Sequence, residues 1–191
     1  MSSAARLVPP GSDIGNVPYT DLRGTWLVVA STLPLWRNKK NVKITYSAIP
    51  GEPETTFDDL VSYELRLAKP GRSPSTVKGI DRLEKGASGR WKWRGKGLLM
   101  IATSKWQLLG FNVSPTVQAA SEPSESKPND PEWVITYFAS TLFTPAGLDI
   151  YSRSKDALSD EFIQGLIEEI GALGEVGSLV KDGGMFRVPH D

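Results

Sequence analysis

Apolar and polar residues alternate with a period of two along most of the chain after residue 20. In the segment NVKITYSAI (residues 41–49), V, I and Y fall on one face and K, T and S on the other. A period of two is typical of a half-buried β-strand. Residues 57–68 and 89–95 alternate in the same way, and residues 24–36 are rich in β-branched and aromatic residues. Further strands are predicted at residues 76–84, 98–113, 132–140 and 148–154, with Pro or Gly turns between several of the segments. The segment 98–113 forms one strand or two, broken near Ser104. We therefore predict about eight short strands at hairpin spacing.

One amphipathic helix is predicted after the last strand. Ser159 is the expected N-cap, the two acidic residues after it suit the helix dipole, and Gly171 and Gly174 mark the end. Its apolar face comprises Phe162, Ile163, Leu166, Ile167, Ile170 and Leu173. The fold class is then all-β: an eight-stranded antiparallel up-and-down barrel with one C-terminal α-helix packed outside.

The predicted organisation is a single domain with two appended segments. Residues 1–20 form a flexible N-terminal segment, residues 21–175 the barrel and helix, and residues 176–191 a loose C-terminal tail. Residues 114–131 are polar and rich in Pro, so we expect a flexible surface loop there, inside the domain.

Composition narrows the chemistry that the barrel can perform. The 191 residues include no Cys and one His, His190, in the expected tail. Disulfides and thiolate chemistry are therefore excluded, and a His-based triad or metal site would have to form on that tail. The 22 Lys+Arg balance the 22 Asp+Glu, which disfavours nucleic-acid binding because that needs a basic surface. We expect no nucleic-acid partner, no membrane span, no metal and no organic cofactor.

The sequence Gly24-Thr25-Trp26 opens the first predicted strand, and Arg153 follows the last one. With this order of strands and helix, the chain resembles the lipocalins over about residues 21–175. The resemblance implies that Trp26 closes one end of the barrel and that Arg153 lies across its ring in a cation–π contact. The chain lacks the Thr-Asp-Tyr motif and the disulfides of secreted lipocalins. It is similar in length, strand order and aromatic content to Cys-poor lipocalin-like cyclases of fungal natural-product pathways, of Diels–Alder and hetero-Diels–Alder type.

Aromatic side chains in the middle of strands are the candidates for a ligand-binding cavity. A barrel of this size has room for packed side chains or for one small ligand, and the aromatic set exceeds what a filled barrel needs. The predicted substrate-binding residues are Trp36, Tyr46, Tyr63, Trp91, Trp93, Trp106 and Tyr137. The catalytic residues stay open, and the candidates that could polarise a ligand carbonyl are Tyr63, Arg66, Asn112 and Tyr137. We interpret the acidic pair Asp58-Asp59 as a feature of a strand start or turn.

We expect a cofactor-independent cyclase of Diels–Alder or hetero-Diels–Alder type, which holds an apolar polyene or quinone methide for secondary-metabolite biosynthesis. Such a reaction needs reacting ends held together, exclusion of water and a polarised carbonyl. The alternative is a non-catalytic carrier of a small hydrophobic ligand, and the sequence does not separate the two. A phenolic-acid decarboxylase is disfavoured, since Tyr63, Glu64 and Arg66 cannot all converge from one strand.

The expected partner is a small hydrophobic molecule, and a homodimer stays open. Because no signal peptide is visible in the first residues, a cytoplasmic location is favoured. A secretory route stays open if the natural N-terminus was replaced.

Overall fold

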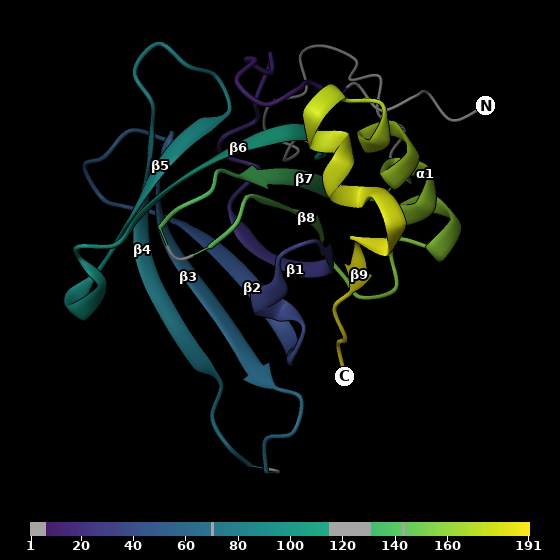
Figure 1. Cartoon of the computed structure of the whole chain (residues 1–191). Helices are drawn as coiled ribbons and strands as arrows, with labels where there is room; N and C mark the ends of the chain where they lie inside the picture. Colours follow the sequence, from purple (N-terminus) through teal and green to yellow (C-terminus); the bar gives the residue numbers. More distant parts are fainter. Residues whose placement is uncertain (1–6, 70, 115–130, 143) are drawn as a thin grey trace.

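The computed structural model describes residues 7–69, 71–114, 131–142 and 144–191 (Figure 1). Within these residues nine strands form one antiparallel sheet in the order β2-β3-β4-β5-β6-β7-β8-β1-β9. The strands are β1 (Gly24–Ser31), β2 (Lys39–Ala48), β3 (Thr56–Leu65), β4 (Ser75–Leu83), β5 (Arg90–Gly95), β6 (Thr103–Asn112), β7 (Trp133–Phe138), β8 (Gly147–Ser152) and β9 (Phe186–Arg187). The helical elements are α1 (Asp160–Gly171) and the 3-10 helices η1 (Pro34–Trp36), η2 (Gly97–Leu99) and η4 (Gly174–Gly183).

The sheet closes into a barrel because β1 pairs with both β2 and β8. Trp26 pairs with Ile44 of β2, and Val28 pairs with Tyr151 of β8. The predicted fold, an eight-stranded antiparallel up-and-down barrel with a helix outside, is confirmed, and the short β9 is added beside β1. We call the end that carries the loops 32–38, 66–74, 96–102 and 139–146 the open end, and the opposite end, near Trp26, the closed end.

Two of the predicted strands are shorter than expected at the open end. The segment 24–36 leaves the sheet after Ser31, because Pro34 begins the 3-10 turn η1. The segment 98–113 enters the sheet only at Thr103, after η2, so the break expected near Ser104 falls at the start of β6. Both changes place a short helical turn at the rim of the barrel.

The helix α1 covers the outer face of the barrel (Figure 1). It packs on β1 and β6–β8, so that these strands are buried on both faces. Ile163, Leu166 and Ile170 of α1 belong to this outer core. The Oγ of Ser159 accepts a hydrogen bond from the backbone N–H of Phe162 at 3.1 Å, which is the predicted cap. No helix in the described part of the chain is long and apolar enough to span a membrane.

The prediction of a loose tail over residues 176–191 is wrong. Val176 and Val180 of η4 are buried beneath α1, and β9 pairs with the end of β1. The backbone N–H of Val188 donates to the carbonyl of Val29 at 3.0 Å. The ring of His190 lies 2.9 Å from the carbonyl oxygen of Val28, and burial lowers the pKa of its imidazole. Apolar side chains at helical spacing hold this segment on the barrel.

The predicted flexibility of the N-terminal segment is also wrong for residues 7–20. The backbone N–H of Val8 donates to the carbonyl of Leu109 at 2.8 Å. Ile14 and Val17 are buried over Gly89, where an added Cβ would come within 2.5 Å of Ile14. Residues 1–6, and residues 115–130 of the predicted surface loop, lie outside the described residues.

Candidate functional site

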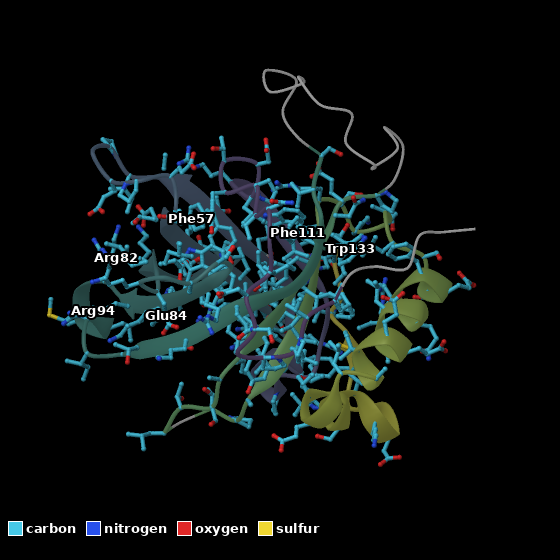
Figure 2. All side chains as sticks on the ribbon, turned by 90° about the horizontal axis from the view of Figure 1, so that it is seen from above. Phe57, Arg82, Glu84, Arg94, Phe111 and Trp133 are labelled. Atoms are coloured by element: carbon cyan, nitrogen blue, oxygen red, sulfur yellow. The ribbon has the colours of Figure 1, made fainter. Side chains whose placement is uncertain are left out.

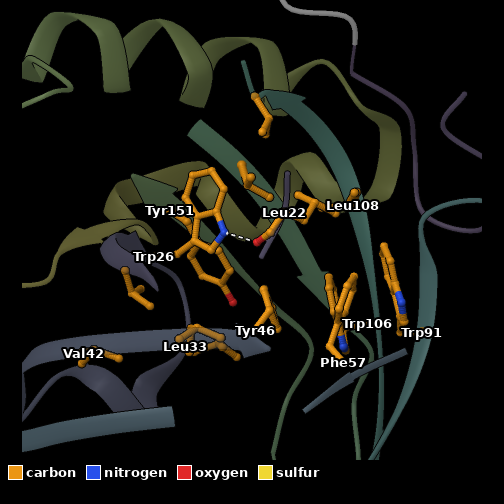
Figure 3. Packing of buried hydrophobic residues seen from close by; sticks show 14 of the residues in the cluster. Leu22, Trp26, Leu33, Val42, Tyr46, Phe57, Trp91, Trp106, Leu108 and Tyr151 are labelled. Carbon is orange, nitrogen blue, oxygen red and sulfur yellow. Dashed lines mark hydrogen bonds between the residues drawn. The ribbon is translucent and has the colours of Figure 1, made fainter. Parts of the chain in front are cut away.

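Aromatic rings stack through the barrel interior (Figure 3). Trp91 and Trp106 lie face to face with ring centroids 4.4 Å apart, and Tyr46 stacks on Trp106 at 5.8 Å. Phe57 contacts both Tyr46 and Trp91, at 5.3 Å and 5.8 Å. All four side chains are buried. Three of the predicted substrate-binding residues therefore pack against one another and form a rigid floor for any site above them.

Three aspartates lie inside the barrel among these rings. Asp59 of β3, Asp81 of β4 and Asp149 of β8 are almost completely buried, and we call them the acid cluster. Asp59 pairs with Gly79, two residues before Asp81, so these two carboxyls come from adjacent positions on neighbouring strands. Asp149 pairs with Thr136 of β7, on another part of the barrel wall.

Indole N–H groups hold the acid cluster in place. Trp106 Nε1 donates to Oδ1 of Asp81 at 2.7 Å, and Trp36 Nε1 donates to Oδ2 of Asp149 at 3.2 Å. Trp93 supplies a hydrogen bond to Asp59. The Trp93 ring lies directly against Gly79, where an added Cβ would be 2.1 Å from Nε1. The glycine therefore makes the space that brings this indole to the carboxyl.

Burial raises the pKa of each carboxyl in the acid cluster, because an apolar surrounding disfavours the charged form. The pKa of Asp149 rises to about 7, against the opposing hydrogen bonds from Ser31 and Trp36. The pKa of Asp59 is raised in the same way. For Asp81, burial and then the neighbouring Asp59 raise the pKa well above its usual range. Near pH 7 a large fraction of these carboxyls is therefore still protonated, and a protonated carboxyl can donate a hydrogen bond.

One oxygen of each of these carboxyls has no hydrogen-bond partner among the described residues; the three atoms are Asp59 Oδ1, Asp81 Oδ2 and Asp149 Oδ1. Buried polar atoms in folded proteins normally have partners. The buried hydroxyls of Tyr46 and Tyr151 lie close by, hydrogen-bonded to each other. The interior thus contains polar atoms with unused hydrogen-bonding capacity, and a polar atom of a bound molecule could pair with them.

The buried ring of Trp36 and the half-buried ring of Tyr63 line the interior toward the open end. The rings of Trp36 and Tyr63 are 6.0 Å apart, and Lys39 Nζ lies 4.2 Å from the Tyr63 ring and 4.9 Å from the Trp36 ring. Burial lowers the pKa of this lysine. A surface hollow of about 600 Å³ lies between the loop before β6 and the loop after β7. Trp93 lines this hollow and also donates a hydrogen bond to Asp59, so its ring lies between the surface hollow and the acid cluster.

Of the four catalytic candidates, only Tyr63 faces the barrel interior. Tyr137 lies on the outer face of β7 and packs against the core under α1. Successive residues of a strand point to opposite faces, and Thr136 and Phe138 take the inward positions on either side of Tyr137. The expectation that Tyr137 lines the cavity is therefore wrong. Asn112 donates its side-chain N–H to the Pro131 carbonyl at 2.9 Å, near the closed end.

Arg66 also lies outside the barrel. Its side chain is exposed just after β3 and donates from Nε to the carbonyl of Lys39 at 3.2 Å. It thus belongs to the open-end surface and does not reach the interior.

The closed end is sealed by Trp26 and Arg153. The Arg153 guanidinium carbon lies 3.5 Å from the centroid of the Trp26 ring. Its Nη2 donates to the Asp21 carbonyl at 2.6 Å, and its Nε pairs with Glu132 at 2.9 Å. The Trp26 indole N–H donates to the Leu22 carbonyl at 2.8 Å (Figure 3). This is the cation–π closure that the lipocalin resemblance implies.

The sequence analysis missed the acid cluster. We interpreted Asp59 as a feature of a strand start or turn; it lies within the first half of β3, not in a turn, and its side chain is buried in the barrel interior. A usable signal existed, because Asp59 has the same parity along the strand as Tyr63. Asp81 carries a similar signal, because it has the same parity as Val77 and Leu83. Asp149 carries none, because it lies between Leu148 and Ile150, and the pattern would place these aliphatic residues inside.

No protein-family model and no curated protein sequence matches the chain. Solved structures with a similar fold include apocrustacyanin C1, at 11% identity and a TM-score of 0.59. Lobster apocrustacyanin A1 and apocrustacyanin C2 each give 11% identity and a TM-score of 0.57. Each comparison covers 97% of this chain and 92% of the other. Together with the Trp26–Arg153 closure, this likeness shows that the fold is lipocalin-like.

Proposed function

We propose that the protein is a cofactor-independent cyclase that acts on an apolar conjugated substrate in the open-end half of the barrel. The observation that carries the proposal is the acid cluster: three carboxyls buried among aromatic rings, each with an unpartnered oxygen. Burying such groups costs stability, and an apolar ligand alone has no use for them. A carboxylic acid kept neutral by an apolar site serves as a hydrogen-bond donor to a substrate oxygen.

The proposed reaction is a pericyclic ring closure of Diels–Alder or hetero-Diels–Alder type. A hydrogen bond to the carbonyl of a quinone methide or an enone withdraws electron density and lowers the barrier to attack by a polyene. Two σ-bonds form as three π-bonds become one, no atom leaves, and no electrons are gained or lost. The barrel contributes enclosure: it holds the two reacting ends together and excludes water.

Asp59 and Asp149 are the proposed donors. Each lies next to an indole at the open end, Trp93 for Asp59 and Trp36 for Asp149. A substrate that enters between these indoles meets a carboxyl on either side. Tyr63 supplies an aromatic wall at the same level.

The test uses a quinone methide and an electron-rich polyene as probes. We expect product to form faster with the protein than without it, and with a single stereochemistry. Asp59→Leu removes the donor and should lower kcat about 100-fold, whereas Asp59→Asn keeps an N–H donor and should retain more of the rate. Asp58→Asn, on the outward-facing neighbour that pairs with Lys96, is the matched control and should match the wild type. Product at the uncatalysed rate and stereochemistry would refute the cyclase.

A carrier of a small hydrophobic ligand is the second candidate. The lipocalin-like fold and the packed aromatic floor favour it, since a rigid apolar wall suits retention of a ligand as well as reaction. The carrier predicts saturable quenching of tryptophan fluorescence by the polyene without product. The same incubations therefore distinguish the two candidates.

A further inference from the structure

The exposed apolar side chains gather at one end of the molecule. Among the described residues, the large hydrophobic side chains with high exposure are Leu65, Leu67, Leu98, Leu99, Met100, Ile101 and Leu142. They lie at the open end, at or after the ends of β3, β5 and β7. Single exposed apolar residues are ordinary, but a concentration of them marks an interaction surface. We call this set the apolar rim.

The same loops are basic. The four open-end loops contain Arg37, Arg66, Lys69, Arg72 and Lys96, and no Asp or Glu. Lys96 pairs with Asp58 of β3 at 2.7 Å, while Lys69 and Arg72 are exposed on the hairpin between β3 and β4. Since the whole chain is neutral, these cations are balanced elsewhere, for example by Glu52 and Glu54 in the closed-end loop after β2. The open-end loops therefore carry a net positive charge on a chain that is neutral as a whole.

We propose that the open end docks on an anionic lipid membrane. The apolar rim would insert among the lipid headgroups, and the basic side chains would contact the lipid phosphates and carboxylates. Membrane-surface segments combine these same two features, apolar side chains on one side and Lys or Arg beside them. The rim is formed by three loops, and four of its seven side chains are consecutive in one of them, Leu98 to Ile101. Such a divided surface suits a fluid headgroup layer. A protein partner would need a matched pocket for each loop.

The position of the hollow beside Trp93 supports this orientation. Ile101 and Leu142 line it from opposite loops, and Leu98 lies on the helical turn beside it. Figure 2 shows Arg94, which precedes this turn, on the side of the barrel away from Trp133 and α1. A membrane at the open end would therefore face the Trp93 hollow and leave the helix clear. Apolar substrates partition into lipid, so docking would bring the barrel entrance to the phase that holds them.

Co-sedimentation with lipid vesicles tests the proposal. We expect binding to vesicles of phosphatidylcholine with about a quarter phosphatidylserine, little binding to phosphatidylcholine alone, and weaker binding as salt rises. The double variant Leu98→Ser/Ile101→Ser should lower the partition coefficient at least tenfold. Lys69→Glu should lower it about tenfold. Lys85→Glu, the same charge change in the exposed closed-end loop after β4, is the matched control and should bind as the wild type does.

Three results would overturn the proposal. The first is no sedimentation with the anionic vesicles, and the second is equal binding by Lys69→Glu and Lys85→Glu. The third combines two observations: the wild type self-associates whereas Leu98→Ser/Ile101→Ser is monomeric, and the two proteins bind vesicles equally. The apolar rim would then be a contact between copies of the chain. Far-ultraviolet circular dichroism of each variant checks that it is folded. Turnover of a dissolved quinone methide needs no vesicles, so failure here leaves the cyclase proposal standing.

Discussion

The buried carboxyl of Asp149 links the stability of the barrel to pH. Its pKa is about 7 in the folded protein and near the ordinary value of 3.8 in the unfolded chain. Between these values the folded state keeps the proton and the unfolded state loses it, so the free energy of unfolding falls as the pH rises. The stabilisation that protonated Asp149 contributes is greatest below about pH 4, declines between about pH 4 and pH 7, and does not change further above about pH 7. A separation of roughly three pKa units corresponds to about 4 kcal/mol.

Asp149→Asn removes this titration while keeping the shape of the side chain and an oxygen to accept from Trp36. We expect the variant to unfold with nearly the wild-type free energy at about pH 4. At about pH 8 the variant should be the more stable protein, by up to about 4 kcal/mol, because it does not bury a charge. Urea titrations followed by tryptophan fluorescence at both pH values measure the difference.

Asp156→Asn provides the matched control, since that carboxylate is exposed on the loop after β8. It should follow the wild-type pH profile. Asp59 and Asp81 shift in the same direction as Asp149, so the variant should reduce the pH slope without abolishing it. The reasoning is refuted if wild-type stability rises between pH 4 and 7, or if Asp149→Asn leaves the slope unchanged.

Three further predictions follow from the closure, the interior glycine and the acids. Arg153→Met should lower the free energy of unfolding by about 2 kcal/mol in urea titrations, with Arg153→Lys restoring only part because it lacks the planar fork. Gly79→Ala should cost about 1–3 kcal/mol and shift the tryptophan emission as the Trp93 ring moves, whereas Gly165→Ala, in open space on α1, should be neutral or stabilising. Cyclase activity that depends on a neutral carboxyl should be present below about pH 7 and lost above it in a pH–rate profile, and a rise across pH 7 would contradict the assignment.

The alternation of side chains was sufficient to predict most of the barrel. Alternation, together with β-branched and aromatic residues between turn signals, located every strand from β1 to β8, although the predicted segments for β1 and β6 ran past the open end of the sheet. The ends of strands were harder to predict where a turn begins inside an apolar segment. Pro34, for example, starts the 3-10 helix η1 within the segment that was predicted as one strand. The packing of the C-terminal segment on the barrel was missed, since only two buried apolar side chains of η4, Val176 and Val180, make a short helical repeat there.

The interior residues of β7 and β8 could not be predicted from the pattern. Because α1 covers their outer face, both faces are buried, and polarity no longer reports direction. Ile150 therefore packs under the helix, while Asp149 and Tyr151 face the interior. The same ambiguity put Tyr137 on the wrong side. Once the helix is placed, Thr136 and Asp149 fall inside together, as their pairing in the sheet requires.

The pairing of β1 with β8 determines when the barrel can close during folding. Each strand from β2 to β8 can pair with its predecessor as soon as it leaves the ribosome, but the second edge of β1 waits for β8. The short β9 pairs with the edge of β1 that β2 also uses. Until β8 emerges, the edge of β1 that pairs with it exposes unpaired N–H and C=O groups, which favour association with other chains. Closure between such distant segments is also slow compared with hairpin formation. The barrel therefore closes only once β8 has been made, and β1 stays open to association with other chains until then.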